Sequence, residues 1–199
     1  MIEIIVRILH ISTIKQSLPF LLSYIDKNRK DKAEKLVNEK DRLLSLGAAY
    51  LLKRYLPKGE IKIMESGKPY LPDGPFFNLS HSGEYVAFVS LDSKDVGVDI
   101  ERIDENKADA IRYVLDEEEK KIDDLPTLFK LWSNKESLIK CSSNGLKDIK
   151  SIKGLPLVGH RNLNGEDYYT ESLVYNGYSL SVSIKGNEPF NMKIINIGN

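Results

Sequence analysis

Residues 96–101 alternate between apolar and other side chains, in the order Val-Gly-Val-Asp-Ile-Glu. This alternation predicts a β-strand, because successive side chains of a strand point to opposite faces. The apolar residues would share a buried face, and Asp99 and Glu101 would point together from the other, with Gly97 leaving space beside them. Two adjacent carboxylates repel each other unless a cation or several donors lie between them, and Mg²⁺ prefers such oxygen ligands. A solvent-exposed edge strand with an acidic face is the alternative interpretation.

Residues 125–141 carry apolar side chains at spacings of three, four and seven, which is typical of an amphipathic helix packed on a core. Pro126 suits the first turn of this helix. Glu136 lies on the apolar stripe, because it follows Trp132 by four residues. A buried, unpaired carboxylate is costly, so we expect a metal or a lysine as its partner. Lys140 lies one turn further on, although a surface Glu–Lys pair worth about 0.3–0.5 kcal/mol is the alternative interpretation.

Two further motifs precede these, namely Gly-Lys-Pro at residues 67–69 and Phe-Asn-Leu-Ser-His-Ser at residues 77–82. Together with residues 96–101 and Trp-Ser-Asn-Lys-Glu-Ser-Leu-Ile-Lys at residues 132–140, they resemble the motifs of the 4'-phosphopantetheinyl transferases. The four motifs occur in the family's order and approximate spacing, over residues from about 40 to 146. The length of 199 residues resembles the two-lobed monomeric members that activate peptide synthetases more than the shorter trimeric carrier-protein synthases.

The resemblance implies an α+β fold of the 4'-phosphopantetheinyl transferase type, with two similar lobes related by a pseudo-twofold axis and the site between them. Residues 1–94 would form the N-terminal lobe, which contacts the nucleotide of coenzyme A. Residues 95–199 would form the lobe that carries the metal-binding carboxylates and the catalytic helix. The implied reaction is Mg²⁺-dependent transfer of the phosphopantetheine group from coenzyme A to a serine of an apo acyl or peptidyl carrier protein, with release of 3',5'-ADP.

The resemblance also implies which residues hold the metal and perform the chemistry. Asp99, Glu101 and Glu136 would bind Mg²⁺, with Glu118 as a secondary candidate. Glu136 would be the general base, directly or through a metal-bound water, and Lys140 would steady the transferring phosphate.

The remaining implied contacts are to coenzyme A, and they come mainly from the first half of the chain. The cofactor-binding candidates are Arg42, Lys68, Pro69, Ser80, His81, Asp99 and Lys140. Lys68 would lie near the adenine or phosphate end of the nucleotide, and His81 would donate to a phosphate, helped by the hydroxyl groups beside it. Lys32 and Lys35 are weaker candidates, and Ser143 stands where the family frequently has glycine.

The acidic run that contains Glu118 has a second explanation. Asp116 and Glu119 have the spacing of a helix capping box, which accounts for the run without a functional role.

Charge and composition limit the alternatives. The 29 basic and 29 acidic residues cancel, so no global charge would recruit nucleic acid or an anionic membrane. Charge is less even locally, with an excess of basic residues over 26–58 and of acidic residues over 92–124. The single cysteine, Cys141, excludes an intramolecular disulfide and fits a reducing cytoplasm. We expect a cytoplasmic monomer with an opening strand in place of a signal peptide, and without a membrane span.

The pattern along the chain predicts mixed elements in two groups. Expected strands lie at residues 2–9, 61–65, 76–80, 85–91 and 96–101, expected helices at 15–26, 31–56, 107–122 and 125–141, and expected hairpin turns at 81–84 and 176–177. Two other function classes stay open. One is a different Mg²⁺-dependent phosphotransferase or hydrolase, and the other is a non-catalytic protein that binds coenzyme A or a carrier.

Overall fold

The computed structural model describes residues 2–143, 149, 152–153 and 155–198, and the end of the resemblance, at residues 144–146, lies outside them. The helices are α1 (Ile11–Gln16), α2 (Leu18–Tyr24), α3 (Lys27–Glu34), α4 (Glu39–Tyr55), α5 (Ala108–Val114) and α6 (Leu125–Ser142), with 3-10 turns at Glu105–Lys107 and Glu119–Lys121. The strands are β1 (Ile2–His10), β2 (Lys62–Ile63), β3 (Pro69–Tyr70), β4 (Phe76–Ser82), β5 (Tyr85–Leu91), β6 (Val96–Arg102), β7 (Val158–Leu163), β8 (Glu166–Tyr175), β9 (Tyr178–Lys185) and β10 (Phe190–Asn196). The predicted α+β class is confirmed.

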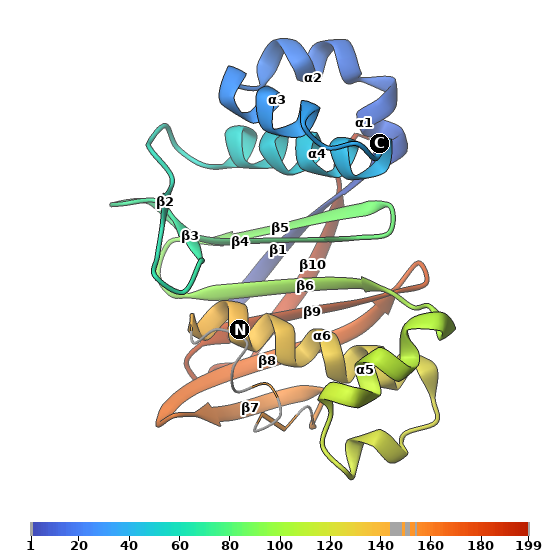
Figure 1. Cartoon of the computed structure of the whole chain (residues 1–199). Coiled ribbons are helices and arrows are strands. Elements are labelled where there is room, and N and C mark those ends of the chain that lie inside the picture. The colour runs from blue at the N-terminus through green and yellow to red at the C-terminus, as the bar shows by residue number, and fades with distance from the viewer. Residues whose placement is uncertain (1, 144–148, 150–151, 154, 199) are drawn as a thin grey trace.

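Two four-stranded sheets form the centre of the molecule, with orders β10-β1-β5-β4 and β6-β9-β8-β7 (Figure 1). Helices α1 to α4 cover the outer face of the first sheet, and α6 covers the second (Figure 1). Strand β10 pairs in parallel with β1, so the last strand of the chain belongs to the first sheet. The predicted division of the chain between residues 94 and 95 stays a prediction, and β10 crosses it.

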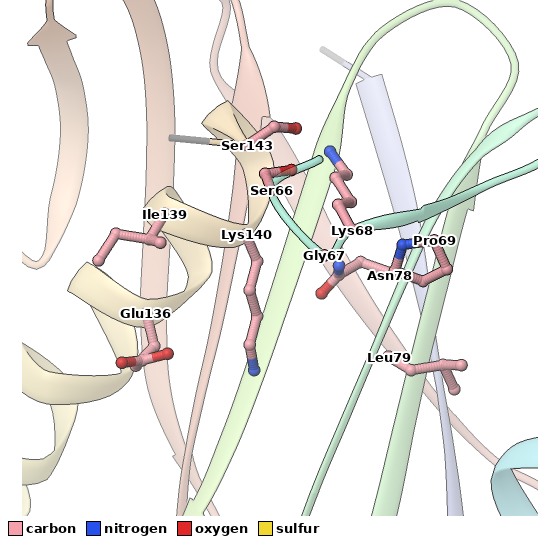
Figure 2. Close-up of a pocket in the computed structure, with 10 residues that line it drawn as sticks. All are labelled: Ser66, Gly67, Lys68, Pro69, Asn78, Leu79, Glu136, Ile139, Lys140 and Ser143. Carbon is pink, nitrogen blue, oxygen red and sulfur yellow. The ribbon is translucent and has the colours of Figure 1, made fainter. Parts of the chain in front are cut away.

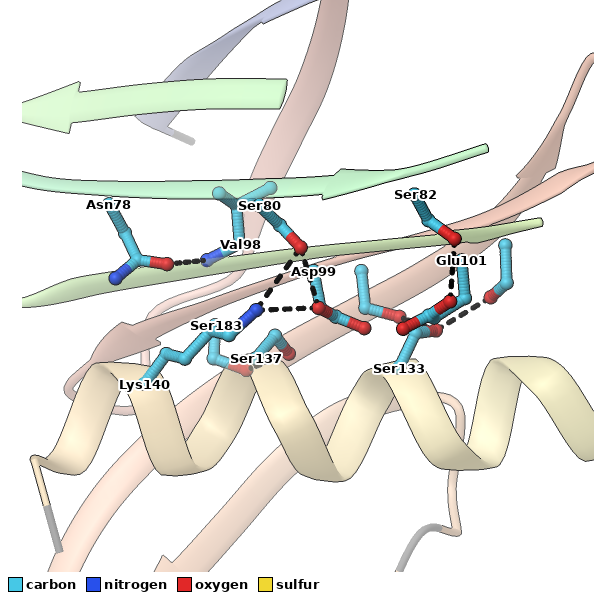
Figure 3. A network of polar contacts seen from close by, with 12 residues as sticks. Asn78, Ser80, Ser82, Val98, Asp99, Glu101, Ser133, Ser137, Lys140 and Ser183 are labelled. Atoms are coloured by element: carbon cyan, nitrogen blue, oxygen red, sulfur yellow. Dashed lines mark hydrogen bonds and ion pairs between the residues drawn. The ribbon is translucent and has the colours of Figure 1, made fainter. Parts of the chain in front are cut away.

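The alternation of residues 96–101 produces the predicted strand β6. Val96, Val98 and Ile100 are fully buried in the core between the two sheets. The opposite face of β6 presents Asp99 and Glu101 toward α6 (Figure 3). The strand therefore separates an apolar core from a polar site.

Helix boundaries in the first half differ from the predictions because local capping interrupts the apolar pattern. The helix expected over 31–56 is two helices, since α4 begins after Asn38, whose side chain accepts hydrogen bonds from the backbone amides of Lys40 and Asp41. The helix expected over 15–26 is also divided, at Ser17, and Pro19 lies in the first turn of α2.

The helix expected over 107–122 is interrupted as well. Helix α5 ends at Val114, and a new 3-10 turn follows the cap at Asp116. The strand expected over 61–65 is reduced to Lys62–Ile63.

Both predicted hairpin turns are confirmed. Strands β8 and β9 meet at Asn176 and Gly177, whose φ angles of 47° and 78° suit a two-residue turn with left-handed backbone at both positions. Strands β4 and β5 meet at Gly83, with φ 57°. None of the helices in the described part of the chain has the length and hydrophobicity that crossing a membrane requires.

Candidate active site

Strands β4 and β6 lie side by side and are joined by side chains, which brings the first sheet to the edge of the second (Figure 3). Asn78 Oδ1 accepts a hydrogen bond from the amide of Val98 at 3.1 Å. Ser82 Oγ accepts one from the amide of Arg102 at 3.1 Å. These contacts form a seam along the acidic face of β6, so residues of both sheets reach one site.

Asp99 lies at the centre of this seam, with 2% of its surface exposed. Its Oδ1 accepts hydrogen bonds from Ser80 Oγ at 2.8 Å and from Lys140 Nζ at 2.6 Å. Its Oδ2 is buried and has no hydrogen-bond partner among the described residues. A buried, ionised oxygen without a partner is costly, and a bound cation would remove that cost.

Glu101 and Glu136 add two carboxylates to the surroundings of Asp99. Burial raises the pKa of Glu101, and the charge of Asp99 raises it further, whereas the hydrogen bond from Ser82 opposes both. Burial also raises the pKa of Glu136 to about 7, reinforced by Asp99 and Glu101 and opposed by Lys140. The three carboxylates therefore act on one another electrostatically, although they come from two different elements.

Helix α6 brings Glu136 and Lys140 to this site. The helix begins as predicted, with Pro126 in its first turn and Asp124 Oδ2 accepting the amide of Thr127 at 2.9 Å. No ion pair joins Glu136 to Lys140 in the described structure, so the alternative of a simple surface pair is not found. Lys140 instead reaches across to Asp99.

A cavity of about 360 Å³ opens between the C-terminal half of α6 and the turn between β2 and β3 (Figure 2). Glu136 and Lys140 line it from the helix, and Lys68 and Pro69 line it from the turn. The Lys140 side chain extends from α6 to Ser80 of β4 and Asp99 of β6 (Figure 3). The cavity is thus lined by an anionic side chain, Glu136, and by the cationic side chains of Lys140 and Lys68.

The donor set fits a hard divalent cation in its chemistry. All three candidate ligands are carboxylates, which Mg²⁺ prefers, and Asp99 Oδ2 lacks a partner among the described residues. No three histidine, cysteine or acidic residues in the described ranges lie close enough to hold a metal in the present arrangement. Lys140 holds Oδ1 of Asp99 and Ser82 holds Oε2 of Glu101, which leaves the second oxygen of each carboxylate for a cation.

Comparison with known proteins finds a likeness to one family. Residues 95–182 match the model of the 4'-phosphopantetheinyl transferase superfamily, and this span contains β6 and α6. The matched span covers less than half of the chain, so the likeness to that superfamily concerns this part of the chain.

Its relatives include 4'-phosphopantetheinyl transferase gsp of Aneurinibacillus migulanus, 32% identical over 142 residues that cover 64% of this chain and 60% of the relative. They also include 4'-phosphopantetheinyl transferase Sfp of Bacillus subtilis, 29% identical over 142 residues that cover 63% of each chain. The chain thus spans less than two thirds of the length of these curated relatives.

Lys68 is not a solvated turn residue. It is 9% exposed, and its Nζ donates to Asp95 Oδ1 and to the carbonyl oxygen of Cys141, both at 3.0 Å. These contacts tie the turn to the end of α6 and fix one wall of the cavity. Contacts of Lys68 and Pro69 with coenzyme A stay predictions.

The predicted group around His81 separates onto two faces of β4. The hydroxyl groups of Ser80 and Ser82 donate to Asp99 and Glu101, whereas His81 is exposed and occupies the alternate position of the strand. The hydroxyls are therefore engaged with the carboxylates and do not assist His81 in this arrangement. The contacts of Ser80 and His81 with coenzyme A stay predictions.

The other predicted contacts of the first half lie on helices. Arg42 is half-buried in the first turn of α4, and its Nε is buried without a hydrogen-bond partner among the described residues. Lys32 and Lys35 are exposed, in α3 and just after it. Their roles toward coenzyme A stay predictions.

The capping box at Asp116 and Glu119 is present, because Asp116 Oδ1 accepts the Glu119 amide at 2.8 Å and Glu119 Oε2 accepts the Asp116 amide at 3.2 Å. Glu118 is exposed and pairs with Lys121 at 2.7 Å. Its place as a secondary metal ligand stays a prediction.

A buried ion pair between α6 and the acidic segment is not among the sequence predictions. Lys135 is fully buried and donates to Glu119 Oε2 at 2.5 Å. The signal was present, because Lys135 follows Leu128 by seven residues and Leu131 by four, and so lies on the apolar stripe. Lys135 is not among the residues that line the cavity, and it anchors the acidic segment to α6.

Proposed function

We propose that this chain transfers the 4'-phosphopantetheine group from coenzyme A to a serine of an apo acyl or peptidyl carrier protein, with release of 3',5'-ADP. The observation that carries the proposal is the arrangement of four charged side chains, Asp99, Glu101, Glu136 and Lys140. The carboxylates act on one another, Lys140 contacts Asp99, and Glu136 and Lys140 line the cavity beside α6. This arrangement occurs in a chain whose residues 95–182 match the 4'-phosphopantetheinyl transferase superfamily. The proposal places the protein in the cytoplasm, as a monomer.

Asp99, Glu101 and Glu136 would hold Mg²⁺. The bound ion would neutralise charge on the pyrophosphate of coenzyme A as the phosphodiester is attacked.

The protein's own side chains prepare the attack. Glu136 would take the proton of the carrier serine as the general base. The serine oxygen forms a bond to the phosphorus that bears the pantetheine arm, and the bond from that phosphorus to the oxygen of the departing 3',5'-ADP breaks. Lys140 would stabilise the transferring phosphate, for which loss of one such contact costs about 3 kcal/mol.

The test is to incubate the protein with coenzyme A, Mg²⁺ and a panel of apo carrier domains, and to weigh each carrier by mass spectrometry. We expect a mass gain of one phosphopantetheine group on at least one carrier. A panel without any gain would contradict the transferase, and turnover of coenzyme A without a carrier would favour a phosphotransferase or hydrolase of another kind.

A further inference from the structure

Ser82 is the last residue of β4 and lies on the seam to β6, with 8% of its surface exposed. Its Oγ donates to Glu101 Oε2 at 2.7 Å and accepts the amide of Arg102 at 3.1 Å. Figure 3 shows Ser82 pointing from β4 to Glu101. A hydroxyl has a single proton, so donation to Glu101 fixes its direction.

The backbone just after Ser82, at Gly83 and Glu84, is also held in place. Tyr178 of β9 is buried, and its hydroxyl oxygen accepts the amide of Glu84 at 3.0 Å. A Cβ at Gly83 would collide with the Tyr178 ring, which packs against the turn. Tyr178 is also the register partner of Arg102. The end of β4 is therefore fixed by β6 and by β9.

The two carboxylates of β6 differ in how they are held. Asp99 receives hydrogen bonds from both Ser80 and Lys140. For Glu101, the hydrogen bond that the structure describes comes from Ser82. A glutamate has more rotatable bonds than an aspartate, so its placement depends more on such an anchor. Ser82 therefore influences the position of the Glu101 carboxylate more than Ser80 influences the position of the Asp99 carboxylate.

We propose that Ser82 is a positioning residue that holds the Glu101 carboxylate in place for the divalent cation of the site. The inference rests on the proposed function, because it assigns Ser82 to the metal-binding half of the same site. Groups that orient metal ligands typically change metal affinity by 10–100-fold when they are removed.

The test measures Mn²⁺ binding by electron paramagnetic resonance of the free ion, with neither coenzyme A nor carrier present. We expect Ser82→Ala to weaken Mn²⁺ binding about 10-fold, and Ser82→Thr, which keeps the hydroxyl, to stay within about twofold of the wild type. Ser90→Ala is the matched control, since Ser90 is a half-buried serine of the neighbouring strand β5. It should bind like the wild type.

A double-mutant cycle separates positioning from a general structural effect. In the background of Glu101→Gln, Ser82→Ala should weaken Mn²⁺ binding no further. Equal weakening in both backgrounds, or wild-type affinity of Ser82→Ala, would overturn the inference. If Ser82→Ala does not fold, Ser82→Cys, with a weaker donor of similar shape, should give an intermediate affinity, and unchanged binding overturns the inference.

The outcome is distinguishable from failure of the proposed function. A wild-type protein that binds Mn²⁺ but modifies no carrier contradicts the transferase and leaves the Ser82 effect measurable. A wild-type protein that does not bind Mn²⁺ overturns the positioning role.

Discussion

The two long helices pack on their sheets in chemically different ways. Helix α4 covers the first sheet with leucines, among them Leu43 and Leu51, which share a core with Val86 and Phe88 of β5. Helix α6 contacts the second sheet partly through hydroxyl groups. Ser133 and Ser137 are fully buried, and they bond to three serines of β9.

Because of this difference, one interface contributes mainly stability, and the other lets the backbones of a helix and a strand approach each other closely. Apolar contacts stabilise by about 25 cal/mol per Å² removed from water, whereas buried hydroxyls are roughly neutral when all are hydrogen-bonded. Serines are small, however, and Gly97 has no side chain, so the backbone of α6 lies directly on β6. That approach allows Lys140 to contact Asp99. We infer that the α4 interface mainly stabilises the fold and that the α6 interface mainly sets the geometry of the site.

The largest expected effect on stability is at the α4 interface. Leu51→Ala should lower the free energy of unfolding by about 2–5 kcal/mol, because it leaves a cavity in a fully buried position. Ser183→Ala at the α6 interface should cost only about 1 kcal/mol, since Ser137 keeps its hydrogen bond to the carbonyl oxygen of Asn134. Urea unfolding measures both, and a larger loss for Ser183→Ala would reverse the comparison.

Each interface contains a glycine, and replacing it by alanine should have different effects at the two interfaces. Gly97→Ala would drive a Cβ into the backbone of α6, at Ser137 and 2.6 Å from the Cys141 nitrogen, and we expect a loss of about 3 kcal/mol or more. Gly47→Ala in α4 would meet Ile14 Cδ1, the flexible end of a side chain, at 2.6 Å. The gain in helix propensity of roughly 1 kcal/mol should offset that contact. Similar thermal stabilities of the two variants would contradict the close approach of α6.

Much of this architecture was predictable from local pattern. The alternation of Val96 to Glu101 and the stripe of α6 depend on side-chain periodicity, and both elements formed as expected. The division between α3 and α4 was missed because a cap at Asn38 outweighed a continuous helical composition. The seam between β4 and β6 was not predictable, because it joins residues about 20 positions apart through side chains alone.

Removing the Glu136 charge should change stability by less than Leu51→Ala or Gly97→Ala does, and the change should be a gain that depends on pH. Its pKa is about 7 in the folded protein and 4.5 ordinarily, so ionisation opposes folding above pH 7 and has no effect once both states are protonated, below about pH 4. At pH 8 and without divalent ions, the free energy of unfolding of Glu136→Gln should therefore exceed that of the wild type by about 1–2 kcal/mol, after allowance for solvent screening.

The same comparison at lower pH is the control. The advantage of Glu136→Gln should shrink as the pH falls from 7 toward 4. A constant difference between the two proteins would show that packing, and not charge, is responsible.

The smallest expected effect is at the end of α6. Ser143 has a left-handed backbone, with φ 62°, and glycine adopts this conformation without strain. Ser143→Gly should raise the free energy of unfolding by about 0.5–1 kcal/mol. Thermal denaturation of the two proteins tests it, and a destabilised Ser143→Gly would show that the serine side chain makes a contact that outweighs the strain.

On the proposed function, α6 carries a catalytic carboxylate, Glu136, into the site at a cost in stability. The most direct test is the rate of phosphopantetheine transfer to an apo carrier by Glu136→Gln, measured by mass spectrometry beside its thermal stability at the same pH. We predict a loss of transfer of about 100-fold or more in a protein at least as stable as the wild type. Transfer at the wild-type rate by a folded Glu136→Gln would contradict the account.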